Sequence, residues 1–406
     1  MRAIVITLGL IICSAPILAA NEVPPQQSTS YDPDPNHPWN QLNSALFARA
    51  APNGTTYGLD ELDILYWYYT EHLLTEPSHT KALQALDRFI KDHQDRLIRD
   101  PVKRVLLQRN LWALFDWSAM PGQTRFMPER VELQARLAVV IHRVALDADE
   151  IAGLPDNYAD VIKSGQLPEL PRGLFDTAGP WVAVGNHGQP VARLHTAAPS
   201  YSGRSLFLVM AQLPEGRPQT LNYLQTLHTY EGPIVGAPQF PAGTAWALVR
   251  RLCIIDDQGR IQPTSLIESI QIRRYLAVPT GRADPEREMQ FMEFDLDPRH
   301  AANLRQVAPG ERDFMLFFQG RGDPFESNTE LLPLEFRPET LRHCMMCHRA
   351  PGILSVNSYH ENIGQKVGNI QHLEDSTVER ETTRGVPWKY HQLDWRLLEA
   401  VSRSQH

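Results

Sequence analysis

Hydrophobic positions divide the chain into an early part with helical spacing and a later part with strand-like spacing. Between residues 57 and 165, apolar side chains recur three or four residues apart, as at Leu83, Leu86 and Ile90, which is typical of amphipathic helices. A proline in the first turn also favours a helix start. The pattern predicts a helical bundle over residues 57–165, with helices that begin near four residues: Asp60, Ser78, Pro101 and Pro128.

From residue 166 onward, the hydrophobic pattern changes to short apolar runs of β-type, separated by turn residues. Leu266, Ile270 and Ile272 keep an even spacing among polar neighbours, which indicates antiparallel strands with one buried face. Asp256 to Gly259 is typical of a hairpin turn. We therefore expect a β-rich domain over 166–336. Its strand-like runs are 181–184, 205–213, 244–255, 265–278, 288–296 and 313–318.

The last segment, 337–406, returns to a mostly helical pattern. A short helix is predicted from Glu339 through Cys344 to about Ala350, where Pro351 and Gly352 would end it. A closing amphipathic helix is indicated by its apolar side chains, namely Trp388, Leu393, Trp395, Leu398 and Val401. The expected fold class is α+β, with a helical bundle, a central antiparallel β-rich domain and a helical C-terminal segment.

The N-terminus has the layout of a secretory signal peptide. Arg2 precedes an apolar stretch, and small residues at Ala19 and Ala20 suit cleavage. We assign 1–20 to this signal and the Pro-, Ser- and Gln-rich stretch 21–56 to a flexible lead-in. An uncleaved membrane anchor is the alternative. No other apolar run approaches the roughly 18 residues that span a bilayer, so we expect a periplasmic or secreted protein without a transmembrane segment after cleavage.

Composition narrows the classes of partner. The 406 residues carry a net charge of −8, whereas nucleic-acid binding needs a basic surface, so we expect no nucleic-acid partner. Removal of the signal peptide leaves three cysteines: Cys253, Cys344 and Cys347. One disulfide would leave a spare thiol, so the set does not indicate a disulfide framework. Cys253 lies in an apolar strand pattern and is expected to be a buried free thiol.

Residues 344–348 read Cys-Met-Met-Cys-His, the C-x-x-C-H pattern of covalent haem attachment. Two thiols one helical turn apart match the two haem vinyl groups, and each adds across one vinyl to form a thioether. His348, fixed beside the second thioether, can then act as the proximal iron ligand. With four cysteines and fifteen histidines in the chain, about 0.001 accidental matches are expected.

Other uses of this motif remain open. A structural zinc site could recruit Cys344, Cys347, His348 and Cys253, but a lone C-x-x-C lacks the second pair of such sites. A redox dithiol normally opens a helix near the start of a thioredoxin-like unit, whereas this motif lies late in the chain. A simple disulfide between Cys344 and Cys347 is a further alternative.

On these residues the chain resembles c-type cytochromes. The resemblance implies one covalent haem c on Cys344 and Cys347, His348 as proximal ligand, electron transfer and a redox partner protein. In the familiar small carriers a methionine downstream of the motif binds the iron's other side, but no methionine follows Met346. His391 or His360 are therefore the candidate distal ligands. Further possibilities are His372, an upstream methionine (Met289, Met292 or Met315) and an open iron.

A second resemblance concerns the order of a β-rich part followed by a late Cys-x-x-Cys-His motif. This order, and the phrase Phe-Pro-Ala-Gly-Thr at 240–244, is similar to the sheet-based relatives of cytochrome c-prime, the cytochrome c-prime-beta group. It also resembles the hydroxylamine-oxidising cytochromes, whose haem is crosslinked by a lysine. No lysine lies between Lys163 and Lys366, so hydroxylamine oxidation by a crosslinked haem is not implied.

The sequence thus predicts a periplasmic single-haem c-type cytochrome that transfers electrons. One alternative is a haem enzyme or gas-binding protein with an open iron, which would perform peroxide or nitrogen-oxide chemistry. Another is an extracellular binding module stabilised by zinc. The pattern leaves open whether the protein is an enzyme, and it singles out no catalytic residue.

Overall fold

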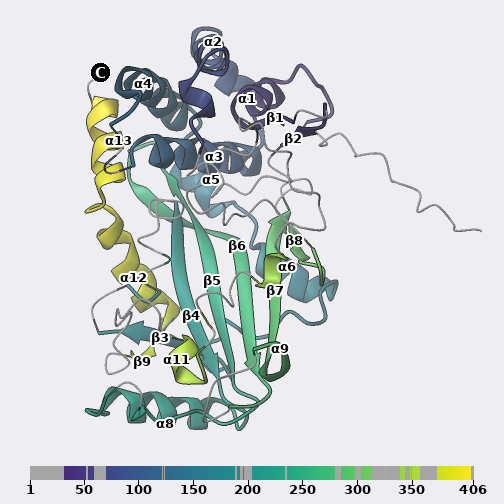
Figure 1. Cartoon of the computed structure of the whole chain (residues 1–406), viewed down its shortest axis with the longest axis vertical. Coiled ribbons are helices and arrows are strands. Elements are labelled where there is room, and N and C mark those ends of the chain that lie inside the picture. Colours follow the sequence, from purple (N-terminus) through teal and green to yellow (C-terminus); the bar gives the residue numbers. More distant parts are fainter. Residues whose placement is uncertain are drawn as a thin grey trace, which may run out of the picture.

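The chain folds into a long, twisted antiparallel sheet with a group of helices at one end and further helices at its other end and along one side (Figure 1), so the expected α+β class is confirmed. The computed structural model describes most of the chain from residue 32 to residue 403. The described residues are 32–51, 54–58, 70–120, 122, 124–187, 190–192, 195, 204–233, 236–278, 285–297, 303–311, 325, 339–342, 348, 350–356 and 373–403. The predicted signal peptide, 1–20, lies outside them.

Three of the predicted helices are present. They are α2 (Ser78–Lys91), α3 (Pro101–Ser118) and α4 (Met127–Arg143). Asp100 caps α3 through a side-chain oxygen that accepts from the backbone N–H of Val102, which satisfies a donor that the first turn leaves unpaired. The helix expected near Asp60 falls largely on residues 59–69, outside the described residues. Shorter helical elements are also described in this part of the chain: η2 (His72–Leu74), η3 (Gln94–Leu97), α5 (Ala148–Ala152) and α6 (Asn157–Ser164), of which α6 packs beside the sheet.

The expectation of a flexible lead-in over 21–56 differs from the structure of residues 32–51. Pro38–Phe47 forms helix α1, and its Trp39, Leu42 and Leu46 are buried. The prolines before it read as loop, but Pro38 occupies the first turn, where the missing N–H costs nothing. A two-stranded ribbon follows, with β1 (Arg49–Ala50) paired to β2 (Thr56–Tyr57).

The central sheet contains seven described strands in the order β8-β7-β6-β5-β4-β3-β9, and all neighbours are antiparallel. Asp256 to Gly259 forms the predicted turn between β5 and β6, while the run 313–318 lies outside the described residues. The strands are β3 (Val182–Asn186), β4 (Ser205–Gln212), β5 (Ala245–Ile255), β6 (Ile261–Tyr275), β7 (Met289–Asp297), β8 (Asn303–Gln306) and β9 (Leu373–Ser376). Two helices near the sheet's ends were not predicted: α8 (Arg217–His228) and α9 (Pro285–Glu288).

The C-terminal segment is built differently from its prediction. Pro351 and Gly352 precede a short helix, α11 (Ile353–Val356), and only η7 (Thr340–Arg342) is described before them. The closing helix is two helices, α12 (Val378–Lys389) and α13 (Leu393–Arg403). Strand β9, which was also unpredicted, pairs with β3 at the sheet edge. The described end of the chain therefore packs on the sheet through β9 and α12, and on α3 and α4 through α13.

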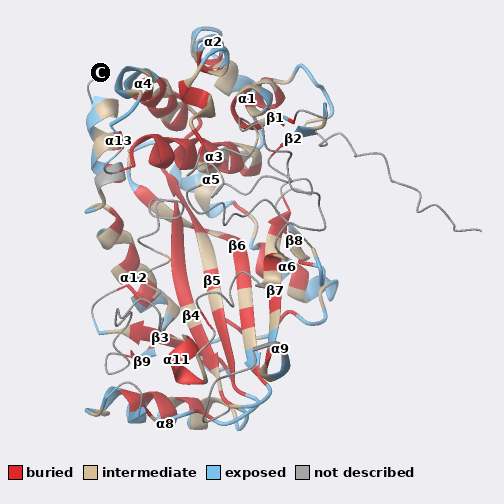
Figure 2. Cartoon of the chain, in the orientation of Figure 1, coloured by how far each residue is buried: buried red, intermediate tan, exposed pale blue. Residues whose placement is uncertain are grey.

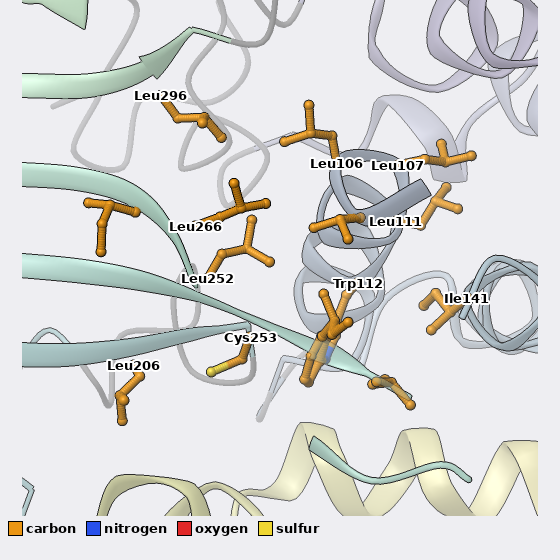
Figure 3. Packing of buried hydrophobic residues seen from close by; sticks show 14 of the residues in the cluster. Leu106, Leu107, Leu111, Trp112, Ile141, Leu206, Leu252, Cys253, Leu266 and Leu296 are labelled. Carbon is orange, nitrogen blue, oxygen red and sulfur yellow. The ribbon is translucent and has the colours of Figure 1, made fainter. Parts of the chain in front are cut away.

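One apolar core joins the helices to one face of the sheet. It includes Trp39 of α1, Trp112 of α3, Leu252 of β5 and Leu398 of α13. Figure 3 shows Leu111 and Trp112 of α3 opposite Leu252 and Leu266 of the sheet, and Figure 2 shows the buried stretches along the strands and α3. Because this core is continuous, the helices and one face of the sheet share a single set of buried apolar side chains.

A smaller core covers the opposite face of the sheet. Trp246, Tyr275 and Met289 from the strands meet Leu224 of α8 and Ile353 of α11. Successive residues of a strand point to opposite faces, so β4, β5 and β6 each contribute to both cores. The second face is the one that carries the candidate site.

In the described part of the chain, no helix combines the length and the apolar composition that crossing a membrane requires.

Candidate functional site

His348, the last residue of the haem-attachment motif, is buried beside α11, with only 7% of its surface exposed. Its Nδ1 is hydrogen-bonded to the backbone oxygen of Ser355. A carbonyl oxygen can only accept, so the ring proton lies on Nδ1 and the lone pair on Nε2. Histidines that bind metals are oriented in this way, with one ring nitrogen donating to a carbonyl or carboxylate.

Ser355 is in turn held by β6. Arg273 donates from Nη1 to the same Ser355 oxygen at 3.0 Å. The Ser355 hydroxyl, fully buried, donates to the Gly352 oxygen at 2.8 Å and also contacts the hydroxyl of Tyr275. Two residues of one strand therefore fix the backbone group that orients His348.

The turn before α11 requires glycine. Gly352 has a φ of +52°, in the left-handed region that residues with a Cβ rarely adopt. A Cβ at this position would also overlap Gln239 Oε1, and that oxygen accepts from the N–H of Ile353 at 2.9 Å. The side chain of Gln239 thus satisfies one of the donors that the start of a helix leaves unpaired.

A second histidine, His195, lies next to His348. The two rings are nearly parallel, with an angle of 5° between their planes and 6.3 Å between their centroids. His195 also lies near Phe207 of β4, with 5.8 Å between the two ring centroids. The two imidazoles are brought together from segments that are far apart in the sequence.

The surroundings keep the His195 ring neutral. Burial is the larger cause, and the positive charges of Arg273 and Arg250 add to it; together they lower the pKa of His195 to about 4. Phe207 and Arg250 are direct partners across β4 and β5, so both belong to the second face of the sheet. At neutral pH His195 therefore carries a nitrogen lone pair, which is the form that binds a metal.

The other predicted ligands are distributed as follows. Cys344, Cys347 and His360 lie outside the described residues, as do His372 and Met315. His391 is described in the turn between α12 and α13, where its side chain is exposed and its N–H donates to the Trp388 oxygen at 3.2 Å. No contact joins His391 to His348.

The two described upstream methionines point to opposite faces of the sheet. Met289 of β7 belongs to the smaller core, and Met292 of β7 belongs to the larger one. Only Met289 is therefore on the face of the sheet that carries the candidate site.

Cys253 is a free thiol with no measurable exposure in the middle of β5. Burial, the largest influence, raises its thiol pKa to about 11, so Cys253 is protonated at neutral pH and packs as an apolar residue. It belongs to the larger core, on the opposite face of the sheet from the candidate site.

Within the described ranges, no three side chains of His, Cys, Asp or Glu are grouped so that they could hold a metal ion. The two cysteines of the motif lie outside those ranges.

Sequence reasoning missed His195, Arg273 and Tyr275 as site residues. No local pattern marks His195, because a single histidine without a second ligand at a fixed spacing carries no signal in the sequence. Tyr275 and Arg273 form part of an alternating strand pattern. They gain a role at His348 only through their contacts with Ser355 of α11.

Comparison with family models, with curated proteins and with solved structures gave no match to this chain.

Proposed function

We propose that this protein is a single-haem c-type cytochrome of an extracytoplasmic compartment that passes electrons to or from a partner protein. The observation that carries the proposal is the Cys344-Met-Met-Cys347-His348 motif together with the hydrogen bond from His348 Nδ1 to the Ser355 oxygen. The first supplies the attachment chemistry, and the second directs the lone pair of the ring to Nε2, as a proximal ligand requires.

The residues present suit a haem. Cys344 and Cys347 would form the two thioethers, and His348 would bind the iron from one side. Arg273 and Arg250, whose charges act on His195, would place positive charge near the two propionate groups that every haem carries. Arg250 also forms an ion pair with buried Glu268, at 3.5 Å. When bound, the haem iron supplies a one-electron couple between its ferric and ferrous states.

The structural role of the polypeptide is to hold this group rigidly. His348 cannot rotate without losing its bond to the Ser355 oxygen, and Ser355 is fixed by Arg273 and Tyr275 on a central strand. A rigid, largely buried ligand changes little between the two oxidation states, so little energy is spent on reorganisation when an electron moves. This property favours electron transfer.

The attachment is tested by expressing the full chain, with its N-terminal segment, in a host that has cytochrome c maturation machinery. The expected product is coloured, keeps its haem after denaturation, and gives the reduced pyridine spectrum of two thioether bonds. Cys347→Ala should lose one thioether. Cys253→Ala is the matched control, because Cys253 is buried on the other face of the sheet, and it should keep both.

Colourless protein from that host would refute the proposal, as would an unchanged two-thioether spectrum in Cys347→Ala. A stoichiometric zinc content in the colourless product would assign the motif to a structural metal site instead.

A further inference from the structure

The parallel arrangement of His195 and His348 calls for an explanation beyond packing. Their centroids are 6.3 Å apart, near the far end of the range of about 4.5–7 Å over which aromatic rings interact directly. Direct contact between the rings therefore contributes little.

We propose that His195 is the second axial ligand of the haem iron, opposite His348, so that the protein carries a bis-histidine haem c. This inference rests on the proposed function, because it requires that a haem is attached at Cys344 and Cys347.

The separation of the two rings agrees with this assignment. A metal ion lies about 2 Å from an imidazole nitrogen, and the nitrogen lies about 1.2 Å from the ring centroid. Two imidazoles on opposite sides of one iron therefore have centroids about 6.4 Å apart, and their planes can be parallel. The observed pair has a separation of 6.3 Å and an angle of 5°.

The hydrogen bond of His348 leaves one ring nitrogen available to a metal. Its Nδ1 bonds to a carbonyl oxygen, so the lone pair lies on Nε2. Histidines that bind metals are oriented in this way.

The assignment also selects between the functions predicted from the sequence. An iron with two histidine ligands has no position for a small molecule unless one ligand leaves, whereas an open iron binds or activates such molecules. His195 is held on the second face of the sheet beside Phe207. A bis-histidine iron therefore favours electron transfer over peroxide or nitrogen-oxide chemistry.

The experiment compares the purified haem-containing protein with its His195→Ala variant. We expect the wild type to show the absorption and electron-spin-resonance signals of six-coordinate, low-spin iron and to resist carbon monoxide in the reduced form. We expect His195→Ala to become high-spin and to bind carbon monoxide readily. Free imidazole added to the variant should restore the low-spin spectrum, which a merely structural role of His195 would not produce.

The chain offers two matched controls. His228 of α8 and His187 form another ring pair with centroids 6.3 Å apart, but their planes are inclined by 46°, and His228 is exposed. His391 is exposed and was one of the two candidate distal ligands named from the sequence. His228→Ala and His391→Ala should both keep the wild-type spectrum.

A second variant keeps the inference testable if His195→Ala does not fold. His195→Met replaces one ligand with another, so it should remain low-spin while its reduction potential rises, as methionine ligation does in cytochromes c. An unchanged potential and spectrum in this variant would overturn the assignment.

Failure of this inference is distinct from failure of the proposed function. A protein with two thioethers whose wild-type iron is already high-spin would refute His195 ligation and leave haem attachment intact. The same holds if His391→Ala, and not His195→Ala, changes the spin state. Absence of covalent haem would remove both proposals.

Discussion

Tyr275 of β6 donates a hydrogen bond to the hydroxyl of Ser355 on α11. The direction follows because the single proton of Ser355 is already given to the Gly352 oxygen at 2.8 Å. This bond ties the sheet to the turn that orients His348, and both partners are buried.

Tyr275→Phe should therefore destabilise the protein. The change removes a donor and leaves a buried hydroxyl oxygen without it, at a cost of about 1–2 kcal/mol in the free energy of unfolding. Urea denaturation measures this loss. Tyr230→Phe removes a hydroxyl that donates to the Pro233 oxygen at 2.9 Å in an exposed loop, and it should change stability by less than about 0.5 kcal/mol. Equal losses in the two variants would contradict the assigned role.

Gly352→Ala tests the turn before α11. Alanine must adopt a φ near +52° and its Cβ must displace Gln239, which bonds to the N–H of Ile353. We expect a loss of about 2–3 kcal/mol. Gly310 has a φ of +77° with open space around its Cβ position, so Gly310→Ala should cost only the backbone strain, about 1 kcal/mol. A loss in Gly352→Ala that is no larger than the loss in Gly310→Ala would show that Gln239 moves away without cost.

Gln108 of α3 joins the helices to the sheet. Its side-chain amide donates to the Ile255 oxygen and accepts from the Ile255 N–H, both at 2.8 Å, and donates to the Ile141 oxygen at 3.0 Å. Gln108→Leu keeps the volume but leaves buried backbone groups unpaired, and it should cost about 2–4 kcal/mol. Gln225→Leu, an exposed change on α8, should stay within about 0.5 kcal/mol. Thermal or urea unfolding of both variants shows whether stability depends on the hydrogen bonds of Gln108 or whether the position tolerates their loss.

The hairpin turn predicts a pH dependence. Burial raises the pKa of Asp256, but hydrogen bonds from the Arg260 N–H, Gln262 and the Arg260 guanidinium, with the charge of Arg260, outweigh it and hold the pKa below 3.8. A carboxyl with a depressed pKa stabilises the fold above its unfolded pKa, and this stabilisation is lost as the pH falls through the folded value. The loss should therefore appear on acidification below about pH 4.

Asp256→Asn should flatten this acid dependence and cost about 1–3 kcal/mol at neutral pH. Its exposed neighbour provides the control, since Asp257→Asn should keep the wild-type slope. Urea midpoints measured from about pH 6 down to about pH 3 decide the question. Parallel curves for wild type and Asp256→Asn would refute the role of the turn carboxylate.

Local patterns in the sequence predicted much of this fold. The even spacing of Leu266, Ile270 and Ile272 correctly placed β6, and the proline at 101 correctly placed the start of α3. Such features succeed because they depend on residues a few positions apart, where period and backbone preference decide the outcome.

Features that depend on distant partners were not predicted. Strand β9 has only four residues, and its β-structure comes from pairing with β3. The prolines before helix α1 indicated a loop, but the apolar side chains of α1 pack into the core that also contains side chains of α2 and α3. His195 is the clearest case, because its relation to His348 exists only after the sheet has brought both segments to one face.

The pairing of β9 with β3 has a consequence for incomplete chains. Since β9 comes after nearly all other elements, β3 remains an open edge strand until the chain is almost finished. A product truncated before Leu373 would expose the backbone N–H and C=O groups of β3, which are a template for a strand of another molecule. Nonsense or proteolytic fragments of this protein are thus expected to self-associate instead of merely losing a tail.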